Sequence, residues 1–355
     1  MKKQVEFKPI VPTPPTLKPR SSAAAQVWAD FCRRLEQCGD LMFSMEGLDE
    51  QPALEAETLR YLIRELRGQL EWQVEHADPA LPHFWRADEP GSGPTGPNVD
   101  NWYLMARVRG GESYKVTLDA RDIFDFLIGV LDQNWRNCGD YSRADFQTNA
   151  NGEVDITFSD ILKGTNCVPL PRDAALLMLR VYYHDWSSDR PPQPRIERIG
   201  GELDRAALPT VDTLERQLKN VSANLQSAPY AYPLWQLRAI DEVPANTFPP
   251  PLDIPGGGGP INYGFARYRL QQDEALIVEF KRPRARYWGL HTYTLPWFSQ
   301  IDVSNRVTSL NDLQLHVDRD DYVRVVVAHD DPGVQNWLDT GGFTTGSVAY
   351  RWIWS

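Results

Sequence analysis

The sequence predicts an α+β protein in which N-terminal helices pack on a β-rich body with a C-terminal antiparallel β-sandwich or jelly-roll-like domain. Two patterns along the chain support this fold. Before residue 75, leucines recur at helical spacing, as in Leu59, Leu62, Leu66 and Leu70. After residue 100, strand-forming segments with turn residues between them follow one another roughly every 8–12 residues, which is typical of sandwiches and jelly rolls.

The length of 355 residues allows one large domain or two to three modest ones. We expect an extended Pro-rich arm over residues 1–20 and a helical segment over 21–90. A β-rich middle domain should follow over 91–240, with a helix near 210–226. The last part, 241–355, should form the C-terminal β-sandwich domain.

The helical segment contains two clear patterns. Ser21 or Ser22 can cap a helix over about 23–38, and Gly39 is a natural helix end. The second helix should run over about 53–75, because Pro52 stands where a first-turn proline is tolerated.

The remaining elements are expected to be strands and turns. In the middle domain, the expected strands are 102–108, 113–118, 153–158 and 176–183. Segment 122–131 fits a short helix or a strand, and both stay open. A long Pro- and Gly-rich loop should cover 243–260. In the last domain, the expected strands are 263–270, 275–280, 286–293, 313–317, 322–329 and 347–354.

Charge and cysteine usage exclude several classes of partner. The net charge is −11, from 37 basic and 48 acidic residues, and no basic cluster interrupts it. This composition argues against nucleic acid and anionic membranes as partners. No run of 18 apolar residues predicts a membrane span. The N-terminus lacks the apolar core of a secretory signal, and the four cysteines show no CxxC spacing, so a cytoplasmic location is expected. The arm over 1–20 is a candidate for contacts between copies of the chain, which would make a homo-oligomer.

Polar side chains gather among the strands of residues 286–339. His329 ends the expected strand 322–329 and lies on the face of that strand that carries its valines. Asp331 follows in a turn. A histidine oriented by a carboxylate can act as a general acid or base near neutral pH, so His329 and Asp331 are the catalytic candidates. The alternative is that His329 bonds the turn and Asp331 caps it through its own backbone.

Seven further residues of this stretch are candidates for substrate binding. Arginine can bind a carboxylate with two hydrogen bonds, and aromatic rings can line an apolar pocket. The substrate-binding candidates are Arg286, Trp288, His291, Tyr293, Asn305, Asn311 and Trp337. Ordinary core packing and turn formation remain the alternatives for these residues. Arg306 is expected instead to hold a sheet corner through an ion pair.

Two expectations concern how these residues are arranged. The side chains that we expect to converge in one place are Asn305, Arg306, Asn311, Asp331 and Trp337. Further upstream, His184-Asp185-Trp186 follows an apolar strand, and the aromatic residues there fit a pocket and a domain interface equally well.

Motifs for common cofactors do not occur in the sequence. It contains no GxSxG, no phosphate loop, no GxGxxG after a strand and no HExxH. We therefore expect no organic cofactor and no metal, although ligands assembled from distant strands remain an alternative.

Several linked motifs resemble one bacterial family. The motifs are Tyr287-Trp288, Asn305-Arg306, Ser309-Leu310-Asn311, Asp331-Pro332-Gly333, Asn336-Trp337-Leu338-Asp339 and Arg351. In order and spacing they resemble the family known as domain of unknown function twelve-fourteen. Upstream motifs extend the resemblance to about residue 90. The resemblance implies a β-rich fold with helices beside it and supplies no reaction. Its members often accompany catabolic pathways for lipids, steroids, terpenoids or aromatics.

These observations predict an enzyme without an organic cofactor. It should act by proton transfer, as a lyase, isomerase or hydrolase, on a small, mainly apolar oxygenated metabolite of the terpenoid, steroid, lipid or aromatic class. The alternative is a non-catalytic binding or carrier protein for the same ligands. A third reading is an assembly protein whose arm exchanges between subunits.

Overall fold

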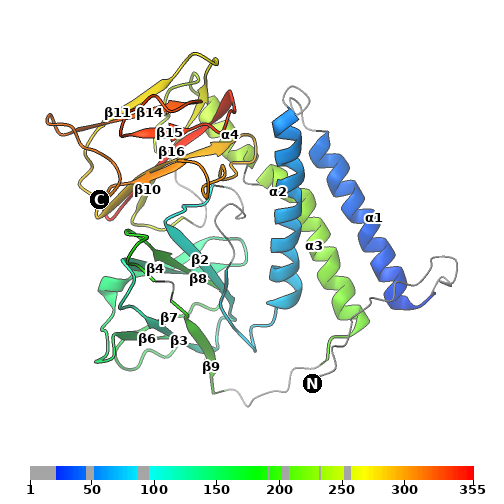
Figure 1. Ribbon diagram of the computed structural model, residues 1–355. Coiled ribbons are helices and arrows are strands. Elements are labelled where there is room, and N and C mark those ends of the chain that lie inside the picture. The colour runs from blue at the N-terminus through cyan, green and yellow to red at the C-terminus, as the bar shows by residue number, and fades with distance from the viewer. Residues whose placement is uncertain are drawn as a thin grey trace, which may run out of the picture.

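Two β-rich bodies and a helical layer make up the protein (Figure 1). The computed structural model describes residues 21–44, 52–86, 96–190, 192–200, 208–231, 233–251 and 257–355. The first β-rich body contains β1 to β9, the second contains β10 to β16, and α1, α2 and α3 lie together along one side of both. The predicted α+β class with N-terminal helices on a β-rich body is confirmed. The predicted arm over residues 1–20 lies outside the described residues.

The first and third helices extend further than their sequence signals indicate, the second lies where it is predicted, and the fourth has no predicted counterpart. The helices are α1 Ala23–Phe43, α2 Pro52–Leu70 with the π-helical turn η2 Glu71–Glu75, α3 Val211–Ala231 and α4 Pro233–Asp241. Ser22 caps α1 as expected, because its Oγ accepts a hydrogen bond from Ala25 N at 3.3 Å. The predicted end of α1 at Gly39 is wrong. Cys38 and Met42 are both fully buried, so apolar packing continues for another turn. None of the helices in the described ranges has the length and apolar character needed to cross a membrane.

The first β-rich body is a sandwich of two sheets. One sheet has the order β1-β2-β8-β4-β5, formed by Trp85–Arg86, Asn101–Arg107, Ala174–Tyr182, Asp125–Asp132 and Asn137–Ser142. The other has the order β7-β6-β3-β9, formed by Cys167–Pro169, Glu153–Ser159, Ser113–Asp119 and Arg195–Ile199. A short 3-10 helix, η3, covers Arg143–Asp145. The undecided segment 122–131 forms β4, whose eight residues are all buried.

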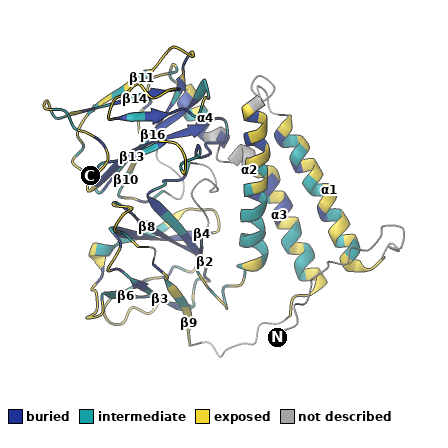
Figure 2. Cartoon of the chain, viewed as in Figure 1, coloured by how far each residue is buried: buried dark blue, intermediate teal, exposed yellow. Residues whose placement is uncertain are grey.

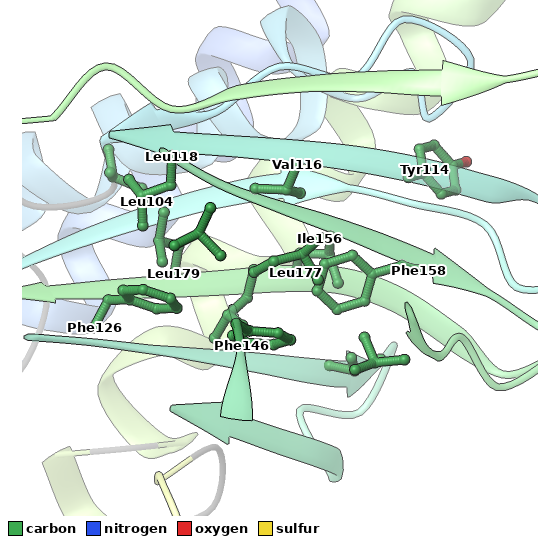
Figure 3. Close-up of a cluster of buried hydrophobic side chains, with 14 of the residues drawn as sticks. Leu104, Tyr114, Val116, Leu118, Phe126, Phe146, Ile156, Phe158, Leu177 and Leu179 are labelled. Carbon is green, nitrogen blue, oxygen red and sulfur yellow. The ribbon is translucent and has the colours of Figure 1, made fainter. Parts of the chain in front are cut away.

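Figure 3 shows the core of this sandwich. Alternate residues of the strands point into it from both sheets, among them Phe126 of β4, Val116 of β3 and Leu179 of β8. Their side chains are fully buried, so the inner faces of both sheets are occupied by apolar packing. Polar residues of the same strands must therefore point to the outer faces.

The second sandwich is built in the same way. One sheet has the order β10-β16-β12-β13, formed by Ile261–Arg269, Thr345–Ile353, Tyr287–Thr294 and Ser309–Asn311. The other has the order β11-β14-β15, formed by Leu276–Lys281, Tyr322–Ala328 and Trp337–Asp339. The predicted strand over 313–317 is wrong. Turns occupy this segment because Asn311 Oδ1 accepts from Leu313 N at 3.1 Å, and Asn311 O accepts from Leu315 N at 2.9 Å.

A tryptophan joins the helical layer to the second sandwich. Trp297 is fully buried and stacks on Tyr61 of α2, with ring centroids 4.6 Å apart. Its indole Nε1 donates to Thr58 Oγ1 at 2.8 Å. One residue of the β-rich body thus supplies both the apolar and the polar contact to α2.

Replacing this tryptophan should loosen the helical layer. We expect Trp297→Ala to lower the free energy of unfolding by about 3–5 kcal/mol, the usual effect of deleting a buried large aromatic side chain. Trp297→Phe keeps the ring stack and loses only the bond to Thr58, so it should lower the stability by about 1–2 kcal/mol. Denaturant titration followed by circular dichroism measures both values. Equal stability of the two variants would contradict the role given to the stack.

Candidate functional site

The two sandwiches meet through the outer faces of two sheets. These are the sheet β1-β2-β8-β4-β5 of the first sandwich and the sheet β10-β16-β12-β13 of the second. Figure 2 shows both sheets as largely buried, although each has its apolar core on the opposite side. On β12, Trp288 and Leu290 point into the sandwich core, so the alternating residues Tyr287, His291 and Tyr293 point outward. All three outward side chains are fully buried. We call this region between the sandwiches the interdomain layer.

Residues from both sandwiches fill the interdomain layer. The first sandwich contributes polar side chains of β2 and β8, and the second contributes those of β12 and β16. The buried polar residues are Asn101, Arg180, Tyr182, Tyr287, His291, Tyr293 and Arg351. The rings of Tyr182 and Tyr287 lie 6.1 Å apart across the layer. Charged and hydroxyl groups are thus buried where two domains face each other, a common place for ligand sites.

The segment 96–100, just before β2, runs along this layer and bonds the second sandwich. Arg351 donates to Gly96 O, Tyr293 OH donates to Pro97 O at 2.6 Å, and Tyr287 OH lies 3.1 Å from Asn98 Oδ1. Gly96 has a φ of +64°, a left-handed conformation that glycine adopts without a steric penalty. The segment is therefore a strap between the two sandwiches.

Asp100 ends this strap and is buried. Its carboxylate accepts from Tyr287 OH and from Trp186 Nε1, each at 2.7 Å. Burial raises the pKa of Asp100 from 3.8 to about 6, while hydrogen bonds from Tyr287, Trp186 and Asn311 oppose the rise. A carboxyl group with this pKa can exchange a proton close to neutral pH.

A histidine and an aspartate pair across the same interface. His184 Nε2 lies 2.8 Å from Asp312 Oδ2, and both side chains keep 17% of their surface exposed. Asp312 is held in turn by Trp288 N at 3.2 Å, and the His184 carbonyl accepts from Asn311 Nδ2 at 3.0 Å. This geometry orients an imidazole with a carboxylate at a position that solvent reaches.

An aromatic wall and a cation lie beside this pair. The ring of His184 packs on Phe124 at 4.4 Å between centroids. The guanidinium of Arg286 lies 5.7 Å from the Phe124 ring and 5.0 Å from the Trp354 ring, and it pairs with Asp125 at 2.7 Å. Because the Arg286 side chain is 53% exposed, its charge is available to a ligand.

The deepest part of the layer surrounds Arg351. Its guanidinium donates to Tyr293 OH at 2.7 Å, and Phe265 and Tyr263 rings lie within 6 Å of it. Burial raises the pKa of Tyr293 to about 12, against the opposing effect of Arg351. Burial, and then the charge of Arg351, hold the pKa of His291 well below its usual value. His291 is therefore neutral, and Tyr293 is a hydrogen-bond donor at neutral pH.

Four of the predicted site residues lie in or beside the interdomain layer. They are Arg286, His291, Tyr293 and Asn311. His291 Nδ1 lies 3.0 Å from Ser309 Oγ. Trp288 does not line the layer, because its side chain is in the core of the second sandwich, 5.9 Å from the Phe280 ring.

The remaining predicted site residues lie apart from the layer. His329 is buried, and its Nδ1 lies 2.6 Å from Thr340 Oγ1. Asp331 is exposed, and its Oδ1 accepts from Gly333 N at 2.8 Å instead of orienting His329. These contacts favour structural roles for both residues, and their catalytic roles stay predictions.

The five residues that we expect to converge, Asn305, Arg306, Asn311, Asp331 and Trp337, each bond a different partner, and their convergence stays a prediction. Asn305 bonds the exposed carboxylate of Asp302, and Arg306 pairs with Asp339 at 2.8 Å, the corner ion pair expected of it. Trp337 Nε1 donates to Ala328 O at 3.3 Å, whereas Asn311 reaches His184 in the other sandwich. Side chains that come from one region of a sheet do not contact one another when turns direct them to different faces.

The sequence reasoning missed Asp100 and Asp312 as site residues. Each follows or precedes a strand whose pattern is visible, but nothing in the sequence shows which residues face the other sandwich. His184 lies at an interface, one of the two arrangements that its aromatic neighbours allow, and its carboxylate partner is 128 residues away. No group of three or more His, Cys, Asp or Glu side chains suited to a metal ion occurs in the parts of the chain that the structure describes.

Comparison with solved structures identifies the fold and not the activity. An uncharacterized protein from Burkholderia cenocepacia is 28% identical, with 94% of each chain covered and a TM-score of 0.86. The VPA0106 protein from Vibrio parahaemolyticus is 13% identical, covering 84% of this chain and 93% of its own, with a TM-score of 0.48 that supports no further comparison. No family profile matches the chain. No curated protein matches it either.

The raised pKa of Asp100 predicts a pH-dependent stability. Because the folded protein binds this proton more tightly than the unfolded chain, the folded state loses stability as pH rises from about 4 to about 6. The total loss in the free energy of unfolding over this range is about 3 kcal/mol. In Asp100→Asn, the side chain at this position is neutral at every pH. The unfolding free energy of the variant minus that of the wild type should therefore rise over this window and stay constant above it.

Glu65 of α2 is a matched control, because burial raises its pKa from 4.5 to about 7. The difference curve of Glu65→Gln should therefore reach its plateau about one pH unit higher than that of Asp100→Asn. Denaturant titrations at pH 4 to 8 measure both curves. A difference curve for Asp100→Asn that does not change with pH would show that Asp100 titrates normally.

A separate substitution tests the structural role of His329. His329→Asn should remove the bond between the imidazole and Thr340 Oγ1 and lower the free energy of unfolding by about 1–3 kcal/mol. Asp331→Ala, at the exposed turn, should change it by no more than about 0.5 kcal/mol. Chemical denaturation measures both. Unchanged stability of His329→Asn would return His329 to the list of catalytic candidates.

Proposed function

We propose that this protein is an enzyme that moves a proton on a small, mainly apolar oxygenated metabolite, in a lyase, isomerase or hydrolase reaction. The observation that carries the proposal is the His184–Asp312 pair at 2.8 Å in the interdomain layer. An imidazole oriented by a carboxylate is a common general acid or base, and His184 keeps enough exposed surface for a ligand to reach it.

The surroundings of His184 supply the other requirements of such a reaction. Arg286, which also lies near the Phe124 ring, can hold an oxygen that gains negative charge. Asp100, whose pKa is about 6, lies one hydrogen bond from Trp186 and from Tyr287. Because its pKa is about 6, Asp100 is suited to donate one proton while His184 removes another.

The aromatic residues around the pair favour an apolar ligand body. Phe124 and Trp354 flank Arg286, and Trp186 is 53% exposed while its indole nitrogen is anchored on Asp100. Rings fixed in this way offer rigid apolar area to a terpenoid, steroid, lipid or aromatic ligand. The exposed and anchored Trp186 would serve a non-catalytic carrier equally well, so a carrier of the same ligands is the second candidate.

Proton exchange with solvent separates the enzyme from the carrier. A thermal-shift screen of terpenoids, steroids and aromatic acids first identifies a ligand, since a ligand at a hundredfold excess over its Kd stabilises the protein by about 2.7 kcal/mol. The ligand is then incubated with the protein in D2O, and deuterium incorporation is followed by mass spectrometry. A lyase or isomerase should incorporate deuterium at a carbon next to the oxygen group of the ligand, and a hydrolase should cleave the ligand into products of different mass. A carrier should bind the ligand and leave it unchanged.

His184→Asn should slow this exchange about a hundredfold or more, the usual contribution of a general acid or base, with little change in melting temperature. Asp312→Asn should also slow it, because the imidazole loses its orienting carboxylate. The matched control is His316→Asn, since His316 lies on the surface near Asp318 at 3.7 Å and is 54% exposed. Exchange in His184→Asn at the wild-type rate would reject the proposal.

A further inference from the structure

Arg351 is a buried cation whose described partners are uncharged. The residue is 3% exposed, and its guanidinium bonds Tyr293 OH and Gly96 O. Among the described residues, no carboxylate lies within 4.0 Å of it, whereas the more exposed Arg286 and Arg306 each pair with an aspartate. A charge buried without an opposite charge is costly, so Arg351 lies in a place suited to an anion.

Arg351 also keeps unused hydrogen-bonding capacity. Its Nε is buried without a hydrogen-bond partner. Buried donors almost always find a partner, because an unpaired one costs roughly 1–3 kcal/mol. Arginine binds a carboxylate through its positive charge and two N–H donors. In Arg351, the charge and the Nε–H donor are available for this interaction.

Gln236 of α4 supplies a second unpartnered group next to Arg351. Its side chain is fully buried, and neither its Nε2 nor its Oε1 has a hydrogen-bond partner. A Cβ placed on Gly96 would lie 3.7 Å from Gln236 Nε2 and 3.9 Å from Arg351 Nη2, so both nitrogens border the same point. An amide donor beside a guanidinium is suited to the two oxygens of one carboxylate.

The rest of the neighbourhood is aromatic. The rings of Tyr263, Phe265 and Tyr293 lie 5.7–5.9 Å from the Arg351 guanidinium. Tyr182 OH, also fully buried in the interdomain layer, has no hydrogen-bond partner. An anion that carries an apolar body would therefore find a charge partner, hydrogen-bond donors and rings in one place.

We propose that Arg351 and Gln236 bind the carboxylate of the ligand, so that the metabolites this protein takes are apolar carboxylic acids in their ionised form. The inference rests on the proposed function for the ligand being a substrate, and it names that substrate's charged group. Binding of the carboxylate itself does not require His184.

The test uses the full-length protein and two probes of similar shape. The probes are 1-naphthoate, which carries a carboxylate, and 1-naphthylmethanol, which does not. Isothermal titration calorimetry should show saturable binding of 1-naphthoate and at least tenfold weaker binding of 1-naphthylmethanol. Equal affinities for the two probes, or no saturable binding of 1-naphthoate, would overturn the inference.

Two variants locate the site. Arg351→Met should weaken 1-naphthoate at least tenfold and remove the preference over the alcohol, and Arg351→Lys should restore part of that preference. Gln236→Leu guards against misfolding of the arginine variant. It replaces two unpartnered buried polar atoms with an apolar side chain of similar size, so its melting temperature should equal or exceed that of wild type while 1-naphthoate binding falls.

Arg267→Met is the matched control. Arg267 belongs to the same sheet, on β10, and pairs with Asp241 at 2.6 Å. This variant should bind 1-naphthoate as wild type does. If Arg351→Met and Gln236→Leu both bind 1-naphthoate with wild-type affinity, the inference is wrong whatever the catalytic result. If they lose binding while His184→Asn keeps full exchange activity, the carboxylate site stands and the proposed reaction falls.

Discussion

The strap over residues 96–100 is the contact on which the arrangement of the two sandwiches depends. In the strap, Gly96 O and Pro97 O accept hydrogen bonds from Arg351 and Tyr293 of the second sandwich, and the Asp100 carboxylate accepts one from Tyr287. At its end, the carbonyl of Asp100 accepts from Tyr183 N of the first sandwich at 2.8 Å. The strap thus satisfies donors that would otherwise be buried without partners when the two sheets approach.

The chemistry of the interdomain layer follows from this packing. Each sandwich already has an apolar core, and its second face carries polar residues that would be solvated in an isolated domain, beside apolar ones such as Leu127 and Ile353. Packing these two faces against each other removes that water. Burial then raises the pKa of Asp100 and lowers that of His291, and it leaves Arg351 positively charged among aromatic rings. Buried groups with shifted pKa values and a buried positive charge do little for the stability of the fold. We therefore place the function in the interdomain layer.

The two proposals divide the layer by depth. His184 and Asp312 lie where solvent still reaches, and a group that exchanges protons with a substrate needs such access. Arg351 and Gln236 lie deeper, where an ionic contact is strong because little water competes for it. One ligand with an ionised group and an apolar body would meet both kinds of surroundings within one interface.

The sequence by itself determined α1, α2 and α3, most strands and the faces of those strands, but it did not indicate α4. Alternation with period two placed Tyr287, His291 and Tyr293 on one face of β12, because successive side chains of any strand point to opposite sides. The strand pattern did not reveal one turn. The hydrogen bond that the Asn311 side chain accepts holds a turn where a strand is predicted. Gly39 was tolerated inside α1 because buried apolar residues flank it.

Only the tertiary structure decided which polar faces are buried and which residues meet there. A polar face of a strand looks the same in sequence whether water or another domain covers it. His184 and Asp312 are 128 residues apart, and Arg351 and Gly96 are 255 apart, so no local spacing connects them. Their meeting depends on the packing of two separately formed sandwiches, a constraint between distant segments that local periodicity does not contain.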